Sequence, residues 1–380
     1  MRKLLTSLAL LSTLIFTLGL VMIFSTTSAD IMSHETYDES YLRQSEPHIA
    51  GSTHHALIKQ VCYAAVSLCI GCAIVKIGYR NFLKYSAPLL AVFTFLLLCT
   101  LIPGIGREVN GSKRWIILGG LSLQPSEFVK YLVPLYFIHH YLKIKREEFS
   151  FRHFIKLVII VAVPIFLILI EPNNGTAAVI IMTLMAFFFL ARIPFSYWAW
   201  PLLAFSLVVG IFASQLPYVT ARLKVYLNPE LDLKGKGHQP YQAKIAAGSG
   251  GLFGKGPGNG LQKLNYLPEA QNDYIAAIFA EEFGFIGILG LICLYLLLAS
   301  HGFYISYSCP DPAGFYLAVS CAFLIAFQSF LNLGVVSGLL PSTGLNLPLF
   351  SQGGCSLMAN ICGIAVLFSI VQMNFKKIRG

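Results

Sequence analysis

Charged residues are scarce in this chain. Asp, Glu, Lys and Arg make up 12% of its 380 residues, whereas 56% are hydrophobic, and the mean hydropathy is +0.70. A soluble globular protein of this length would carry charges on about a quarter of its residues. The shortage of charge therefore excludes a soluble protein.

Groups of metal-ligating side chains are also lacking. The nine cysteines are scattered, and only Cys69 and Cys72 form a CxxC, inside an apolar segment. The histidine pairs at 54–55 and 139–140 have no Cys or carboxylate at ligand spacing. We predict no metal site in the protein and interpret the cysteines as small packing residues.

Long apolar segments recur along nearly the whole chain, and each is long enough to cross a bilayer as a helix. We predict an all-α polytopic membrane protein with about ten transmembrane helices, forming a single domain over residues 1–380. The expected spans are 4–26, 58–79, 85–103, 128–143, 156–171, 176–191, 197–214, 274–300, 313–340 and 356–374. The expected extracytoplasmic loops are 28–57, 104–127, 215–273 and 341–355, and the longest joins the seventh and eighth helices.

The distribution of basic residues predicts the orientation of the chain. Ten spans place both termini on one side, and most Lys and Arg outside the long loop fall on that side, among them Arg2, Lys84, Lys143 and Lys376. The positive-inside rule then places both termini in the cytoplasm. The net charge of +10 is read first as this topology signal, and no nucleic-acid partner is expected.

The long loop is the exception to that rule, because it is basic although it lies outside. It also carries a run of glycines between residues 248 and 260, together with Lys255 and Lys263. Backbone N–H groups of such a run could bind phosphate, although the spacing matches neither a P-loop nor a dinucleotide fingerprint. Attraction of an anionic substrate, a solvated charged loop and a flexible linker all remain open.

Asp273 ends this loop and opens the eighth apolar segment. A carboxylate there is held at the outer membrane surface, where it could act as a base or merely cap the helix. Glu281 follows two turns later and could line the same cavity, whereas Glu282 is expected on the opposite side. One carboxylate among many bases suits glycosyl transfer from a lipid-linked pyrophosphate sugar better than glycoside hydrolysis, which usually needs two carboxylates.

Two other outer segments carry polar residues beside Gly and Pro. Arg114 and Trp115 suit a membrane interface, and Glu127 and Lys130 share one face at the start of the fourth helix. That pair is either a structural ion pair or part of a substrate site. The Gly/Pro-rich segment 341–355 predicts broken backbone that lines an outward-facing cavity.

The sequence resembles the SEDS family, the shape, elongation, division and sporulation proteins, over nearly its whole length. The matching stretches are GREVNGSKRWIILGGLSLQPSEFVK, YLNPELDLKGKGHQPYQ, GKGPGNGLQKLNYLPEAQNDYIAAIFAEEFG and GLLPSTGLNLPLFSQGGCS. The residues around 108–115 and 262–270 are more similar to the division members than to the elongation members. Glu171-Pro172-Asn173 departs from the family's usual Gln-Pro-Asp.

The resemblance implies a peptidoglycan glycosyltransferase that polymerises lipid II in the bacterial inner membrane. It implies a class B penicillin-binding transpeptidase and other divisome membrane proteins as partners. It places the family's essential aspartate on Asp273, which would act as general base. Its other functional residues fall on Arg114, Trp115, Glu127, Lys130, Glu269 and Glu281. Arg114, the loop lysines or a divalent cation, Mg²⁺ or Mn²⁺, would hold the leaving pyrophosphate.

Two other functions remain open from the sequence. Intramembrane charges and broken outer loops also suit a transporter that flips lipid II, although no inverted repeat is evident. A scaffold that recruits the transpeptidase without chemistry of its own is the third possibility.

Overall fold

The protein is described by a computed structural model. It describes residues 2–36, 53–109, 112–118, 121–144, 148–215, 226, 237–264, 267 and 270–379. Most of the predicted loop 28–57 and Glu269 therefore lie outside the described residues.

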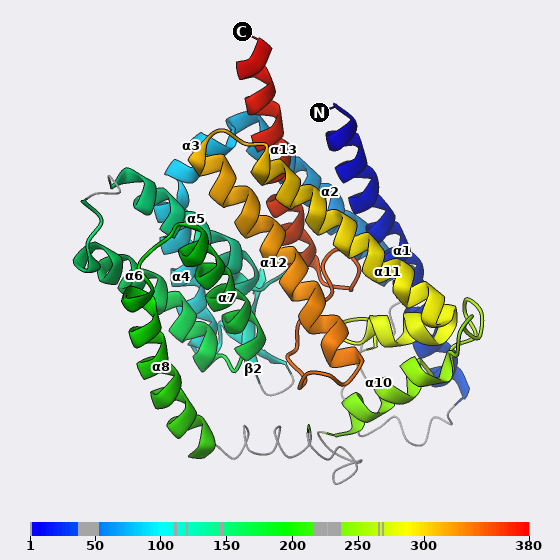
Figure 1. Ribbon diagram of the computed structural model, residues 1–380. Coiled ribbons are helices and arrows are strands. Elements are labelled where there is room, and N and C mark those ends of the chain that lie inside the picture. The colour runs from blue at the N-terminus through cyan, green and yellow to red at the C-terminus, as the bar shows by residue number, and fades with distance from the viewer. Residues whose placement is uncertain are drawn as a thin grey trace.

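Helices make up most of the described chain (Figure 1). They are α1 (Arg2–Thr36), α2 (Thr53–Ile77), α3 (Tyr79–Lys84), α4 (Ser86–Leu101), α5 (Pro125–Lys143), α6 (Phe151–Ile170), α7 (Asn174–Leu190), α8 (Phe195–Gln215), α10 (His238–Ser249), α11 (Ile275–Tyr307), α12 (Pro312–Val336) and α13 (Gly354–Arg379). Each predicted span overlaps one of these helices. Helices α3 and α10 were not predicted.

Among the described residues, six helices are long and apolar enough to cross a membrane, namely α1, α2, α6, α11, α12 and α13. Helices α4 and α7 are apolar but shorter. The prediction of a helical, multi-pass membrane protein is confirmed, and the count of ten crossings stays a prediction.

A small antiparallel sheet was not predicted. Strands β1 (Gly106–Val109), β2 (Ser112–Leu118) and β3 (Leu121–Leu123) lie in the order β1-β2-β3 within the segment expected to be an irregular loop. Gly106 is required where β1 leaves α4, because a Cβ there would lie 1.8 Å from the carbonyl oxygen of Thr100. The sheet fixes Arg114 and Trp115 on β2, where Trp115 pairs with Arg107.

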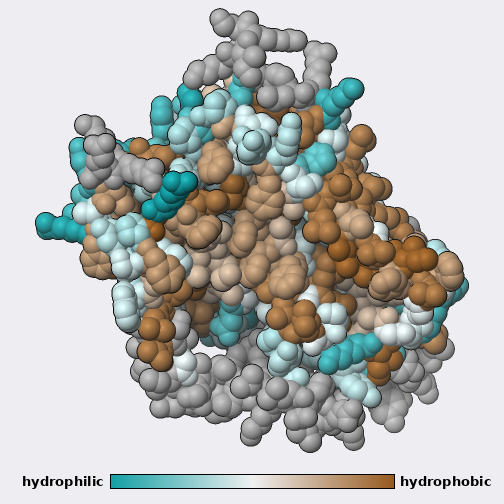
Figure 2. All heavy atoms as spheres, viewed as in Figure 1, coloured by the Kyte–Doolittle hydropathy of each residue, from teal (hydrophilic) through white to brown (hydrophobic). Residues whose placement is uncertain are grey.

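The chain ends lie together at one end of the helix bundle, whereas β2 and α10 lie at the other (Figure 1). Hydrophobic residues cover the middle of the visible face, and hydrophilic residues gather toward the two ends (Figure 2). This distribution suits a protein whose middle contacts lipid.

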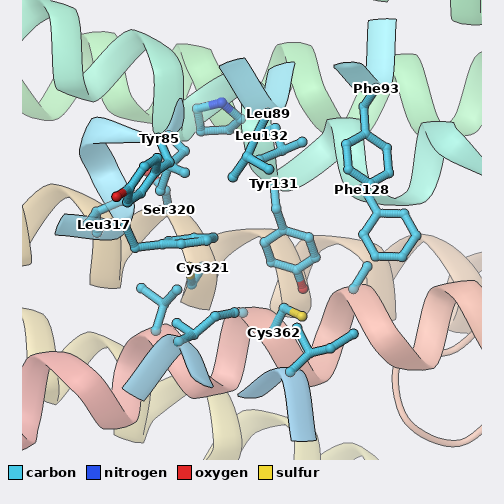
Figure 3. A pocket seen from close by; sticks show the side chains of 18 of the residues that line it. Tyr85, Leu89, Phe93, Phe128, Tyr131, Leu132, Leu317, Ser320, Cys321 and Cys362 are labelled. Carbon is cyan, nitrogen blue, oxygen red and sulfur yellow. The ribbon is translucent and has the colours of Figure 1, made fainter. Parts of the chain in front are cut away.

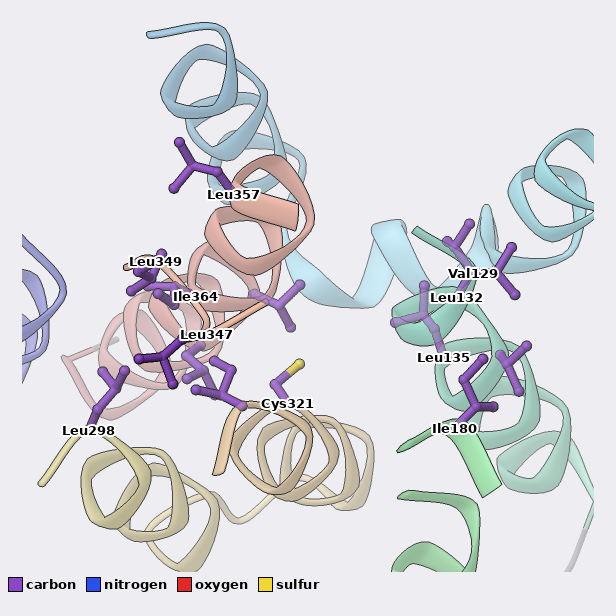
Figure 4. Packing of buried hydrophobic residues seen from close by; sticks show 14 of the residues in the cluster. Val129, Leu132, Leu135, Ile180, Leu298, Cys321, Leu347, Leu349, Leu357 and Ile364 are labelled. Atoms are coloured by element: carbon purple, nitrogen blue, oxygen red, sulfur yellow. The ribbon is translucent and has the colours of Figure 1, made fainter. Parts of the chain in front are cut away.

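The buried core joins helices that are distant in sequence (Figure 4). One cluster includes Leu298 on α11, Cys321 on α12, Leu357 on α13 and Leu132 on α5. Leu347 and Leu349, from the irregular segment between α12 and α13, pack into it as well. That segment is therefore part of the packed interior and has a fixed place within it.

Candidate active site

Asp273 lies in the turn before α11 and is partly exposed. The N-cap of α11 is Tyr274, and no side-chain hydrogen bond caps the helix. The side chain of Asn332 on α12 donates to the backbone carbonyl of Asp273 at 2.8 Å. One carboxylate oxygen lies beside Gly344, where an added Cβ would be 3.7 Å away. Asp273 is thus held by its backbone next to the segment between α12 and α13.

That segment, residues 337–353, has little regular structure, as the glycines and prolines predicted. Several of its backbone carbonyls accept hydrogen bonds from side chains, as irregular backbone inside a membrane protein requires. Asn332 also donates to the carbonyl of Leu345 at 2.7 Å, and Asn346 donates to that of Gln352 at 2.7 Å. The N–H of Gln352 donates to the carbonyl of Gln271 at 3.0 Å, so the segment is tied to the Asp273 turn.

The predicted ion pair between Glu127 and Lys130 is present, with 2.6 Å between Lys130 Nζ and Glu127 Oε2. Lys130 is fully buried and donates a second hydrogen bond, of 2.9 Å, to Gln328 on α12. Gln328 in turn donates to the carbonyl of Asn346 at 2.7 Å. The pair therefore points into the protein, as the cost of a charge in lipid requires, and it contacts the same segment as Asp273.

Gln328 and Asn332 were missed from the sequence. They lie one helical turn apart on α12 and are fully buried. Two amides at this spacing inside an apolar span would have been the signal, because polar residues within a membrane helix usually face a polar partner. Together they connect the Glu127–Lys130 pair with Asp273.

Arg114 joins the site through the turn between α6 and α7. Its guanidinium donates to the carbonyls of Glu171 and Pro172 at 2.9 and 2.6 Å. The side chain of Asn173 then donates to Ser126 Oγ at 3.3 Å, one residue before Glu127. Two of the N–H groups of Arg114 thus hold this turn in place. Trp115, its neighbour on β2, is partly exposed.

Glu171 is a buried carboxyl group in this turn, just outside α6. One of its oxygens accepts a hydrogen bond from Thr100, and the other has no hydrogen-bond partner among the described residues. Burial raises the pKa of Glu171 to about 7, although the Thr100 hydroxyl and the charge of Arg114 act against the shift. Glu171 therefore binds its proton at a higher pH than an exposed glutamate does.

The loop lysines contact carboxylates of the protein itself. Lys255 pairs with Glu281 at 2.6 Å, and Lys263 pairs with Glu282 at 2.6 Å. Glu281 also accepts from the backbone N–H groups of Leu261 and Gln262, at 3.0 and 3.1 Å. The loop does bind anions with its N–H groups, and the anions are the carboxylates of Glu281 and Glu282.

Two expectations about these glutamates need correction. Glu281 is fully buried by the glycine-rich loop, so its carboxylate does not line an open cavity with Asp273. Glu282 does not lie on the opposite side, because it too contacts the loop through Gly258 N–H and Lys263 and also accepts from Ser25 on α1. The loop contacts both glutamates, which a helical wheel of α11 alone cannot represent, and α11 itself departs from helical geometry two residues after Glu282.

The departure occurs at Gly284, which has φ 68° inside α11. The loop supplies the hydrogen bonds that the broken helix lacks. Lys255 and Gly256 N–H groups donate to the carbonyls of Glu281 and Glu282, both at 3.0 Å. Phe285 N–H donates to the Gly251 carbonyl at 2.9 Å. The loop is therefore folded against α11, and the flexible-linker interpretation of this part is wrong.

In the part of the chain that the structure describes, no three His, Cys, Asp or Glu side chains gather as a metal site.

Comparison with known proteins identifies the family. The family model for FtsW, RodA and SpoVE, described as "Cell cycle protein", matches residues 5–376. The chain belongs to this family. It is 40% identical to the "Probable peptidoglycan glycosyltransferase FtsW" of Legionella pneumophila over 84% of this chain and 82% of the relative. It is 35% identical to the "Stage V sporulation protein E" of Bacillus subtilis over 96% of this chain and 95% of the relative.

Solved structures share the fold. A chain of a peptidoglycan synthase complex, described as coordinating polymerization and crosslinking, aligns with a TM-score of 0.74 and 26% identity over 96% of this chain and 97% of its own. The rod shape determining protein RodA of Thermus thermophilus aligns with a TM-score of 0.65 and 25% identity over 96% of each chain. The resemblance to the SEDS family is therefore confirmed.

Proposed function

We propose that the protein is a peptidoglycan glycosyltransferase that polymerises lipid II during cell division. The observation that carries the proposal is the setting of Asp273, a partly exposed carboxylate held at the mouth of α11 by Asn332 and by the segment around Gly344. Family membership and relatives named as glycosyltransferases support the same activity.

In this reaction Asp273 accepts the proton of the acceptor's sugar hydroxyl. The hydroxyl oxygen forms a bond to the anomeric carbon of the donor sugar, and the bond from that carbon to the pyrophosphate oxygen breaks. The lipid pyrophosphate leaves with the electron pair of that bond and needs no proton. Arg114 and Trp115, at the same end of the molecule, would contact the pyrophosphate and the sugar or lipid.

The loop lysines have a different part in this proposal. Lys263 is buried against Glu282, so in this conformation it positions the loop and does not reach a substrate. Lys255 has a side chain that is 30% exposed and could extend toward an anion while its partner Glu281 keeps two backbone donors. A direct role for Lys263, Glu269 or Glu281 in substrate binding remains a hypothesis.

The partner we propose is a class B penicillin-binding transpeptidase, which would crosslink the new glycan, together with other membrane proteins of the divisome. The relative solved within a peptidoglycan synthase complex supports such an assembly. We place the protein in the bacterial inner membrane with both termini in the cytoplasm.

The deciding experiment measures polymerisation of lipid II by the purified protein together with its transpeptidase. Asp273→Asn should lower the rate by at least about a hundredfold, the usual contribution of a general base. Asp311→Asn is the matched control, because Asp311 lies near the chain termini, between α11 and α12, and bonds Tyr79 and Arg80. Full activity in Asp273→Asn would exclude the base role.

The same samples separate the two alternatives. Movement of lipid II across liposomes without polymer would identify a flippase. Normal division in cells that carry Asp273→Ala, with no polymer formed in vitro, would identify a scaffold.

A further inference from the structure

A large apolar cavity lies away from Asp273. Its volume is about 550 Å³, and it is enclosed by α2, α3, α4, α5, α12 and α13 (Figure 3). The lining includes Ile77 at the end of α2, Leu89 near the start of α4 and Leu317 near the start of α12. These helix ends lie on the side of the molecule that carries the chain termini (Figure 1). The cavity therefore reaches from Phe128, next to Glu127, toward the end opposite to Asp273.

The cavity opens to the lipid-facing surface. Tyr85 and Val92, which both line it, are each 55% exposed, and Ile77 is 46% exposed. Nearly all lining side chains are hydrocarbon or aromatic, so water is a poor occupant. An alkyl chain entering sideways from the bilayer would bury apolar surface on both partners.

Basic residues lie next to this cavity, on the side of the molecule that carries the chain termini. Lys84 lies between two lining residues, Phe82 and Tyr85. On α5 the lining face, Leu132 and Leu135, continues at helical spacing as His139 and Lys143. Helix α3, which ends at Lys84, packs against α5, which ends at Lys143.

No described carboxylate forms an ion pair with Lys84 or Lys143. Asp311, which precedes α12, is engaged by Arg80 at 3.2 Å and by the Tyr79 hydroxyl at 2.6 Å. A cationic rim next to an apolar, membrane-open cavity is complementary to an amphipathic anion.

We propose that the cavity binds an acyl chain of an anionic phospholipid whose phosphate lies between Lys84 and Lys143. Lysines near the membrane surface attract anionic head groups, and basic pockets between membrane helices are a recurrent site for such lipids. A lipid-linked substrate is the less suitable occupant, since its reacting phosphate belongs near Asp273, at the other end. The competing explanation is that these lysines serve topology alone.

The test counts lipids bound to the purified full-length protein by native mass spectrometry. The probes are phosphatidylglycerol and phosphatidylcholine with identical acyl chains. We expect phosphatidylglycerol to bind about tenfold more tightly, and we expect Lys84→Gln combined with Lys143→Gln to abolish that preference. Val92→Trp, which fills the cavity from an exposed position, should weaken both lipids.

Two matched controls keep the result specific. Arg152→Gln combined with Lys156→Gln removes two exposed charges from α6, and Val163→Trp adds the same ring to an exposed position on α6; none of these residues lines the cavity. The controls should keep the wild-type lipid preference, and the melting temperature verifies that each variant folds.

Three outcomes would overturn the proposal: equal binding of the two lipids to the wild type, an equal loss of preference in the control pair, or insensitivity to Val92→Trp. Tighter binding of undecaprenyl pyrophosphate than of phosphatidylglycerol at this cavity would assign it to the polyprenyl lipid instead. Because the readout is binding, it does not depend on the proposed polymerase activity.

Discussion

Glu171 is an acid placed where its surroundings disfavour negative charge. Burial is the largest cause of its raised pKa of about 7, and two N–H groups of the Arg114 guanidinium donate to backbone carbonyls beside it. A Gln at this position would keep the shape and the Thr100 contact without a charge. The residue thus makes this turn sensitive to pH.

Glu171→Gln should remove that sensitivity. The folded pKa lies above the unfolded value of about 4.3, so the folded state binds more protons between about pH 4.3 and 7. The contribution of protonated Glu171 to the free energy of unfolding is therefore complete below that pH window and is lost as the pH rises through it. At pH 8 the variant should be more stable than the wild type, by on the order of 1–3 kcal/mol.

The measurement is the melting temperature of the purified protein at pH 5 and pH 8. The difference between variant and wild type should be large at pH 8 and small at pH 5. Glu108→Gln, an exposed acid on β1, is the control and should change neither value. A pH-independent difference for Glu171→Gln would contradict the ionisation argument.

At the scale of secondary-structure elements, helix α11 and the glycine-rich loop form one unit. The helix breaks at Gly284, and the loop supplies the missing backbone partners through residues 251–256. Two glutamates on α11 then need counter-charges, which Lys255 and Lys263 supply. The ion pairs are a consequence of burying carboxylates beneath this loop.

Lys263→Met should destabilise the protein strongly, by about 3–5 kcal/mol, because it leaves Glu282 buried without its cation. Lys255→Met should cost clearly less, since the Lys255 side chain is 30% exposed and Glu281 keeps its backbone donors. Thermal or denaturant unfolding of the two variants makes the comparison.

The double variant Lys263→Met with Glu282→Gln supplies the control. It removes both charges and should recover much of the lost stability. If Lys263→Met unfolds no earlier than Lys255→Met, the buried pair does not hold the loop as described.

At the scale of the whole molecule, the two chain ends lie at one end of the bundle and the sheet and α10 at the other (Figure 1). The bases near the termini predict that this end faces the cytoplasm.

A fluorescent protein fused at either terminus should therefore fold and fluoresce in the cytoplasm. Alkaline phosphatase inserted after Ser249 should be active only if this position is outside, as we expect. Active phosphatase at either terminus would reverse the orientation.

The alternation of apolar spans and polar loops could be predicted from the sequence because a bilayer imposes a length and an apolar composition on every crossing helix. Asp273, Arg114 and the Glu127–Lys130 pair stand out for a related reason: charge near apolar segments is rare and costly. Composition and spacing therefore determined the fold class and the predicted orientation and singled out these residues, and the family resemblance implied their roles.

Contacts between distant segments were decided only by the tertiary structure. The sheet at 106–123 depends on pairing between strands, and Gln328 and Asn332 acquire their importance from the backbone carbonyls that meet them. From the sequence alone, Lys263 could be taken for a phosphate ligand. In the structure its Nζ lies 2.6 Å from Glu282 Oε1, so it pairs with that carboxylate. Which partner a buried polar group finds depends on how the helices pack, and local sequence does not contain that information.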